Sequence, residues 1–204
     1  MPIWIYSLIA YLSTKIDLFQ FGFFIASNIR LPYIKKIQLT ETRLKALENE
    51  LQHGDLLFGR REWFLKNTIV PGYYKHVGSW DAEKKLVIEM QDDGYTESTL
   101  QQFIERYTEV GIGRPFFTKE YATLFIKTLR TFSDKDYDSK FSQNTSQMYC
   151  SESIHCADVE NKLKYSTTKV LWKQVYIPHE LLNLPTVKKI MIIKKPNFIE
   201  YFEA

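Results

Sequence analysis

The sequence predicts a mixed domain in which an antiparallel β-hairpin is combined with amphipathic helices. His76 to Trp80 and Leu86 to Met90 are largely apolar runs joined by the polar stretch 81–85, which is typical of two strands and a turn. Further along, apolar residues recur at helical spacing over residues 121–132. With 204 residues, 45% of them hydrophobic, the chain can bury one sizeable core.

The same patterns predict the remaining elements. A helix is expected where leucines recur at helical spacing before the His53-Gly54-Asp55 turn signal, and a buried strand directly after that turn. In order, we expect a helix at 40–51, a strand at 56–58, a short helix capped by Ser98 and Gln101, a strand at 110–112, a surface loop at 133–148, a helix at 151–163, and strands at 175–177 and 187–193.

Charge and cysteine content exclude several classes of function. Twenty-seven Lys and Arg against 24 Asp and Glu leave a net charge of +3, and no basic tract is interleaved with aromatics, so we expect no nucleic-acid partner. The four histidines are scattered, and no Cys/His pair has metal-ligand spacing, so we expect no metal site. Two cysteines without a clear signal peptide favour a cytoplasmic or membrane-associated protein.

Residues 1–45 are predicted to form an apolar helical extension. The first thirty are rich in apolar and aromatic residues, but Lys15 and Asp17 interrupt them, and neither half reaches the ~20 apolar residues of a membrane-spanning helix. Two interpretations are open: a pair of short helices packed on the domain or on a partner, and a membrane-surface anchor formed by residues 1–35.

Cys150 is a candidate nucleophile. It stands at the first turn of the helix predicted at 151–163, where unpaired N–H groups and the helix dipole favour a thiolate. Cys156 lies mid-helix among apolar residues, which is typical of a small buried side chain. Six residues along one helix place the two on different faces, so we expect two free thiols. Without partners, a packed free cysteine is the simpler interpretation of Cys150.

The predicted hairpin supplies possible partners for Cys150. A turn about residues 82–83 pairs the strands so that His76 lies opposite Glu89, Gly78 opposite Val87, and Trp80 opposite Lys85. Opposed residues share a face, with Cβ atoms ~5 Å apart. A carboxylate there can hold one imidazole nitrogen and leave the other for a thiol, and Gly78 leaves room for substrate. A solvated cross-strand ion pair is the alternative.

Other polar residues are given structural roles. His53 is a second candidate base, but its place before Gly-Asp predicts a loop position. His155 and His179 are expected at the surface. Asp55 and Glu152 are expected as caps or ion-pair partners, and Glu152 suits a helix N-terminus.

Five segments together match one pattern: His53-Gly54-Asp55-Leu56-Leu57-Phe58, Lys75-His76-Val77-Gly78, Val87-Ile88-Glu89, Tyr137-Asp138-x-x-Phe141 and Tyr149-Cys150-Ser151-Glu152. In this order they resemble the circularly permuted papain-like cysteine hydrolases, the YiiX-like branch of the NlpC superfamily, which is related to lecithin retinol acyltransferase. The resemblance runs from about Gln52 to Lys195. It implies an α+β fold with a small antiparallel sheet or barrel packed on the nucleophile helix, within a catalytic domain over 46–204.

This resemblance also implies roles. Cys150 is then the nucleophile, His76 the general base and Glu89 the third member, in a cysteine hydrolase without a cofactor. Its substrate would be an amide or peptide bond of a cell-wall peptide or an amide-linked lipid, cleaved through an acyl-enzyme on Cys150. Two alternatives stay open: a lipid acyltransferase or thioesterase of the same fold, and a catalytically silent module that binds peptide or lipid.

Overall fold

A computed structural model of the chain describes residues 37–60, 71–141, 146–170, 173–194 and 198–202. Seven of its strands form one sheet in the order β11-β10-β5-β1-β2-β3-β4, and all neighbours are antiparallel. These strands are β1 (Leu56–Arg60), β2 (His76–Asp81), β3 (Leu86–Gln91), β4 (Gly94–Thr99), β5 (Glu109–Pro115), β10 (Val187–Lys194) and β11 (Phe198–Tyr201). Two short pairs complete the strands: parallel β6 (Asp136–Tyr137) with β7 (Gln147–Met148), and antiparallel β8 (Thr168–Val170) with β9 (Lys173–Val175).

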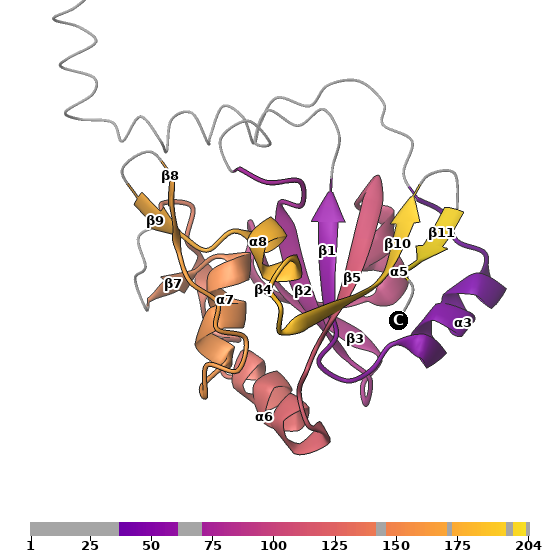
Figure 1. The fold of residues 1–204 in the computed structure, drawn as a ribbon, viewed down its shortest axis with the longest axis horizontal. Coiled ribbons are helices and arrows are strands. Elements are labelled where there is room, and N and C mark those ends of the chain that lie inside the picture. The colour runs from indigo at the N-terminus through magenta and orange to yellow at the C-terminus, as the bar shows by residue number, and fades with distance from the viewer. Residues whose placement is uncertain (1–36, 61–70, 142–145, 171–172, 195–197, 203–204) are drawn as a thin grey trace, which may run out of the picture.

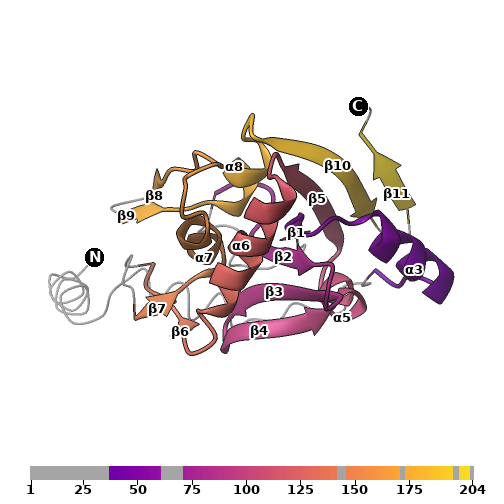
Figure 2. The same cartoon turned by 90° about the horizontal axis from the view of Figure 1, so that it is seen from below.

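Helices cover both faces of the sheet (Figures 1 and 2). They are α3 (Glu41–Glu50), α5 (Leu100–Glu105), α6 (Lys119–Arg130), α7 (Cys150–Ala157) and α8 (Pro178–Leu182). On one face α6, α7 and α8 bury a cluster that includes Phe58, Val77 and Phe125. On the other, α3 and α5 bury a second cluster around Trp80 and Phe103. Along β1 the side chains alternate between the two cores, as the pleat requires: Leu56 and Phe58 belong to the first cluster and Leu57 to the second.

The predicted mixed architecture is confirmed, and most of the predicted elements are present. The helices at 40–51 and 121–132, the strand at 56–58 and both hairpin strands lie where we expected them. The short strand predicted at 110–112 is part of a longer central strand, β5, which is paired on both sides. The capping box starts one residue later than predicted, at Thr99 with Gln102.

Two expectations were wrong. The stretch 133–148 contains β6 and β7, and its Asp138 is fully buried, so its described part is not simply a surface loop. The strand expected at 175–177 is instead β9, which ends at Val175, and α8 begins shortly after it at Pro178. The interpretations of residues 1–35 fall outside the described residues. Within the described ranges, no helix is long and apolar enough to cross a membrane.

The helix that begins at Cys150 ends at Ala157, six residues before its predicted end. Asp158 ends the helix because its side chain binds the backbone that follows. Its two carboxylate oxygens accept the backbone N–H groups of Lys162 and Leu163, each at 2.8 Å. The hydroxyl of Tyr121 on α6 also donates to this carboxylate, at 2.6 Å. Side chains of this type favour turns because they compete for backbone hydrogen bonds.

The hairpin register differs from the predicted one by two residues. Gly78, not His76, lies opposite Glu89. The connection is a four-residue loop rather than a two-residue turn, because the Asp81 carboxylate accepts the N–H groups of Glu83 and Lys84 (2.9 and 3.2 Å) and Lys85 takes a positive φ of 56°. An even shift keeps every side chain on its predicted face, so His76 and Glu89 still share one.

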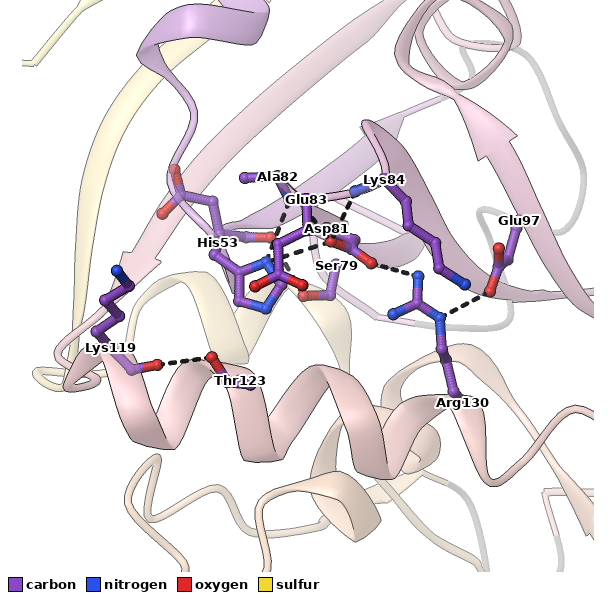
Figure 3. A network of polar contacts seen from close by, with 11 residues as sticks. His53, Ser79, Asp81, Ala82, Glu83, Lys84, Glu97, Lys119, Thr123 and Arg130 are labelled. Carbon is purple, nitrogen blue, oxygen red and sulfur yellow. Dashed lines mark hydrogen bonds and ion pairs between the residues drawn. The ribbon is translucent and has the colours of Figure 1, made fainter.

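A polar network ties this hairpin to α6 (Figure 3). Arg130, at the end of α6, reaches between two carboxylates and pairs with both Asp81 and Glu97. His53 completes the network, because its Nδ1 accepts the N–H of Ala82 at 3.2 Å and lies 3.3 Å from Asp81. Burial opposes the charged form of Asp81, but Arg130 and the turn N–H groups outweigh it and hold the pKa of its carboxyl below the usual range.

Arg130→Ala should lower the free energy of unfolding by about 3 kcal/mol, because it leaves the buried Asp81 carboxylate without its cation. Urea denaturation at pH 7 measures this change. Lys127→Ala is the matched control: Lys127 is exposed on the same helix, and its loss should change stability by no more than about 0.5 kcal/mol. Equal effects of the two substitutions would contradict this role of Arg130.

Candidate active site

The sheet and α7 together place the three predicted site residues. His76 is the first residue of β2, Glu89 lies near the end of β3, and Cys150 is the first residue of α7. α7 packs against β2 and β3. The structure therefore brings Cys150, His76 and Glu89 together from three separate segments.

His76 and Glu89 are joined directly. Nε2 of His76 lies 2.7 Å from Oε2 of Glu89. The two residues are diagonal neighbours across the hairpin, and Gly78 separates them on the His76 strand. A Cβ on Gly78 would come within 2.8 Å of Val87 Cγ1 and 3.2 Å of Glu89 Cβ. Gly78 therefore allows the close approach of these neighbours. The expectation that it leaves room for substrate was wrong, because Val87 and Glu89 fill that space.

The second imidazole nitrogen of His76 is the one available to Cys150. Since Nε2 is engaged by Glu89, Nδ1 is the nitrogen that remains for the thiol. Burial disfavours a charged imidazole, but the negative charge and the hydrogen bond of Cys150, followed by those of Glu89, raise the pKa of His76 to about 9. His76 therefore holds a proton at neutral pH beside a sulfur that can carry the matching negative charge.

Arg106 is the positioning residue that the sequence did not reveal. The Glu89 side chain is fully excluded from solvent, and the Arg106 guanidinium pairs with its second oxygen, Oε1. Arg106 also donates to Ser98 Oγ at 3.2 Å. Burial would raise the pKa of the Glu89 carboxyl, but His76 and then Arg106 outweigh it and hold that pKa below its usual range. Glu89 is therefore an anion clamped from both sides.

Aromatic rings fix the plane of the imidazole. Tyr107 stacks on His76 with ring centroids 5.9 Å apart and an interplanar angle of 21°, and Phe103 lies 6.1 Å away. Gly59, opposite His76 on β1, makes this possible, because a Cβ there would lie 2.5 Å from the Tyr107 ring. A glycine inside a strand pattern is the signal from which this close approach was predictable.

Cys150 lies at the N-terminus of α7. Cys150 is the first helical residue, so its backbone N–H has no acceptor within the helix. Glu152 caps this end by accepting the N–H of Tyr149 at 3.4 Å, which confirms its predicted role. Burial, only partly offset by that hydrogen bond, raises the pKa of Glu152 to about 7.

Two tyrosines that the sequence did not single out, Tyr137 and Tyr165, pack in the same core cluster as Cys150. Burial, and then the negative charge of Cys150, raise the pKa values of Tyr137 and Tyr165 well above the usual value. Both hydroxyls therefore keep their protons at neutral pH.

The other predicted polar residues lie outside this group. His53 belongs to the Asp81 network and is not the base. Asp55 forms a two-pronged ion pair with Arg114, at 2.9 and 2.8 Å, as a turn anchor. His155 is not a surface residue as expected, since it is half-buried and stacks on Tyr176 at 4.2 Å. Cys150 and Cys156 are both free thiols, as predicted.

Comparison with known proteins gives the family. Residues 50–196 match the sequence profile of a family described as permuted papain-like amidase enzyme, YaeF/YiiX, C92 family. The chain belongs to this family. Its members are amidases of the cysteine peptidase class C92, so the predicted family and enzyme class are confirmed. No protein of curated function is detectably similar in sequence.

A solved structure supports the permuted papain-like fold. The chain resembles a protein described as metalloprotein yiiX from Escherichia coli O157:H7, with a TM-score of 0.54 and 18% identity over 68% of this chain and 96% of that one. That description calls the relative a metalloprotein. In the described ranges of this chain, no group of three or more His, Cys, Asp or Glu side chains is arranged to hold a metal ion.

Cys150→Ser should lower the pKa of His76 from about 9 towards 6.5, because it removes the negative charge that most favours the imidazolium. NMR titration of the histidine Cε1–H signals, with His76→Gln to assign the resonance, measures this pKa. Cys156→Ser is the control and should leave it unchanged. Identical titrations in wild type and Cys150→Ser would show that sulfur and imidazole are not coupled.

Proposed function

We propose that the chain is a cysteine amidase that cleaves its substrate through an acyl-enzyme on Cys150. The observation that carries this proposal is the placement of His76 between the Glu89 carboxylate, 2.7 Å from Nε2, and the Cys150 thiol. A nucleophile, a base and a group that orients the base are the components that covalent acyl transfer requires. Membership of an amidase family supports the same reaction.

The first half-reaction uses the ion pair. The Cys150 thiolate attacks the amide carbonyl, a C–S bond forms, and the carbonyl oxygen becomes an oxyanion. In this proposal the backbone N–H of Cys150, at the N-terminus of α7, stabilises that charge. As the C–N bond breaks, His76 gives the proton on Nδ1 to the leaving amine.

The second half-reaction restores the enzyme. Neutral His76 takes a proton from water, and the water oxygen attacks the thioester. The C–S bond breaks, the carboxylic acid leaves, and the thiolate and imidazolium form again. Glu89, itself held by Arg106, keeps the imidazole in one orientation throughout and stabilises its charge.

For substrates we propose amides of peptides or of lipids. The description of the family as amidases supports the bond type, whereas the apolar sequence of residues 1–35 is the argument for a lipid or membrane surface. Co-sedimentation with liposomes of the full chain and of a chain lacking residues 1–35 tests the second point. Equal recovery of both proteins would refute a membrane role for that segment.

The proposal predicts a specific pattern of lost activity on a panel of peptide and acyl amides. Cys150→Ala should abolish product release, because no acyl-enzyme can form, and His76→Ala should lower kcat/KM by about 10²- to 10⁴-fold. Mass spectrometry of the wild type, quenched during turnover, should show the acyl group on Cys150.

Cys156→Ala is the matched control and should retain wild-type kcat/KM, because that thiol lies outside the site. Unchanged product release by Cys150→Ala would overturn the proposal. A labelled phospholipid separates hydrolysis from transfer: hydrolysis leaves a free acid, and transfer leaves an acylated amine or alcohol.

A further inference from the structure

A buried tyrosine hydroxyl lies beside the nucleophile helix without a hydrogen-bond partner. Tyr165 belongs to the segment that joins α7 to β8, and it is only 4% exposed. Its hydroxyl is excluded from solvent and forms no hydrogen bond with any of the described residues. A buried polar group in this state costs free energy, so it calls for an explanation, and an unfilled ligand contact is one.

Contacts along its length place Tyr165 against α7. Its main chain lies at His155, whose charged form it favours through a hydrogen bond. Its ring packs on that of Tyr176, with centroids 5.1 Å apart and an interplanar angle of 51°. Tyr165 belongs to the core cluster that also contains Cys150 and Ile154. The side chain is therefore held on the sheet side of the nucleophile helix and not in solvent.

The hydroxyl end of Tyr165 lies beside the first turn of α7. Ser151 and His155 are four residues apart, so they share one face of the helix, with Ser151 nearer its N-terminus. Burial and then the charge of Cys150 raise the pKa of Tyr165, and the Ser151 hydroxyl opposes them. Both residues that act on the hydroxyl belong to the first turn, so the hydroxyl lies near the nucleophile.

Neighbouring polar groups are already engaged with one another. Ser151 Oγ donates to the Tyr176 carbonyl at 2.7 Å, and the Tyr176 N–H donates to Tyr149 Oη at 3.0 Å. The hydroxyls of Ser151 and Tyr165 are neighbours but do not complete a hydrogen bond with each other. The Tyr165 proton is therefore available to an acceptor that a substrate brings to Cys150.

We propose that the Tyr165 hydroxyl, together with the backbone N–H of Cys150, donates a hydrogen bond to the carbonyl oxygen of the substrate when Cys150 attacks. The C–S bond forms, the carbonyl π electrons move to oxygen, and the proton stays on Tyr165. Because the pKa of Tyr165 is raised, the group acts as a donor and not as an acid. A donor fixed before the reaction stabilises the developing charge without reorganisation. This role rests on the proposed amidase function.

Tyr165→Phe in the full chain removes the hydroxyl and keeps the ring. Because the hydroxyl has no partner in the free protein, the thermal unfolding midpoint should not fall, whereas loss of a structural hydrogen bond would lower it. On an amide that the wild type cleaves, kcat should fall by about 10²-fold, with KM changed by less than about twofold. Tyr176→Phe is the matched control, because it removes a hydroxyl from the adjacent ring and should keep wild-type kcat.

The acyl-enzyme provides a spectroscopic readout of the same hydrogen bond. An activated ester, p-nitrophenyl acetate with an isotope label at its carbonyl carbon, acylates Cys150 whatever the natural substrate is. Isotope-edited infrared difference spectra then report the stretching frequency of the thioester carbonyl. A hydrogen bond to that oxygen lowers the frequency, so Tyr165→Phe should raise it and Tyr176→Phe should leave it unchanged.

Wild-type kcat together with an unchanged carbonyl frequency in Tyr165→Phe would overturn the role of the hydroxyl and leave the amidase proposal intact. Equal losses of kcat in Tyr165→Phe and Tyr176→Phe, with a lowered unfolding midpoint, would also overturn it, since they indicate a structural role. An active Cys150→Ala protein, or a wild type that forms no acyl-enzyme, would instead overturn the amidase proposal, and the role of Tyr165 with it.

Discussion

The buried carboxylate of Glu89 is the constraint on which the site depends. An ionised group excluded from water is tolerated only when other charges and hydrogen bonds match it. His76 and Arg106 provide that match from opposite sides, and Ser98 and Tyr107 hold these two partners in turn. The demand of one buried charge on β3 thus fixes an imidazole on β2 and a guanidinium after α5. The helix α7 then places Cys150 beside Nδ1, the imidazole nitrogen that Glu89 does not engage.

The residues of the candidate site come from both faces of the sheet. The aromatic residues that orient His76 belong to the core under α3 and α5, whereas Cys150 belongs to the core under α6, α7 and α8. His76 connects the two because it stands at the very start of β2, where its side chain can reach past the strand end. This explains why the order of histidine and cysteine along the chain does not matter: roles are set by position in space. The Asp81 network fixes the other end of the same strand against α6.

Much of the fold was predictable from local sequence patterns. The failures arise where side-chain hydrogen bonds or ion pairs, which such patterns do not show, decide the structure. Helical spacing located α6, and the turn signals located both hairpin strands, because these depend on neighbouring residues. The predicted register was wrong by two residues because the Asp81 side chain stabilises a longer loop. The helix α7 ends early because Asp158 accepts the N–H groups of Lys162 and Leu163, just beyond the helix. Arg106 was not found, since its partner Glu89 is seventeen positions away and no local pattern connects them. Gly59 did carry a readable signal, an isolated glycine in a strand, but its partner Tyr107 is known only from the fold.

The pairing of Cys150 with His76 is the central claim, and the pH dependence of Cys150 alkylation tests it most directly. Iodoacetamide rates are measured in wild type and in His76→Ala, with mass spectrometry to separate Cys150 from Cys156, whose pKa burial and Glu152 raise to about 11. We expect the wild-type thiol to titrate well below the ~8.5 of a free cysteine, and His76→Ala to return it towards that value. An ordinary titration that is the same in both proteins would contradict the claim.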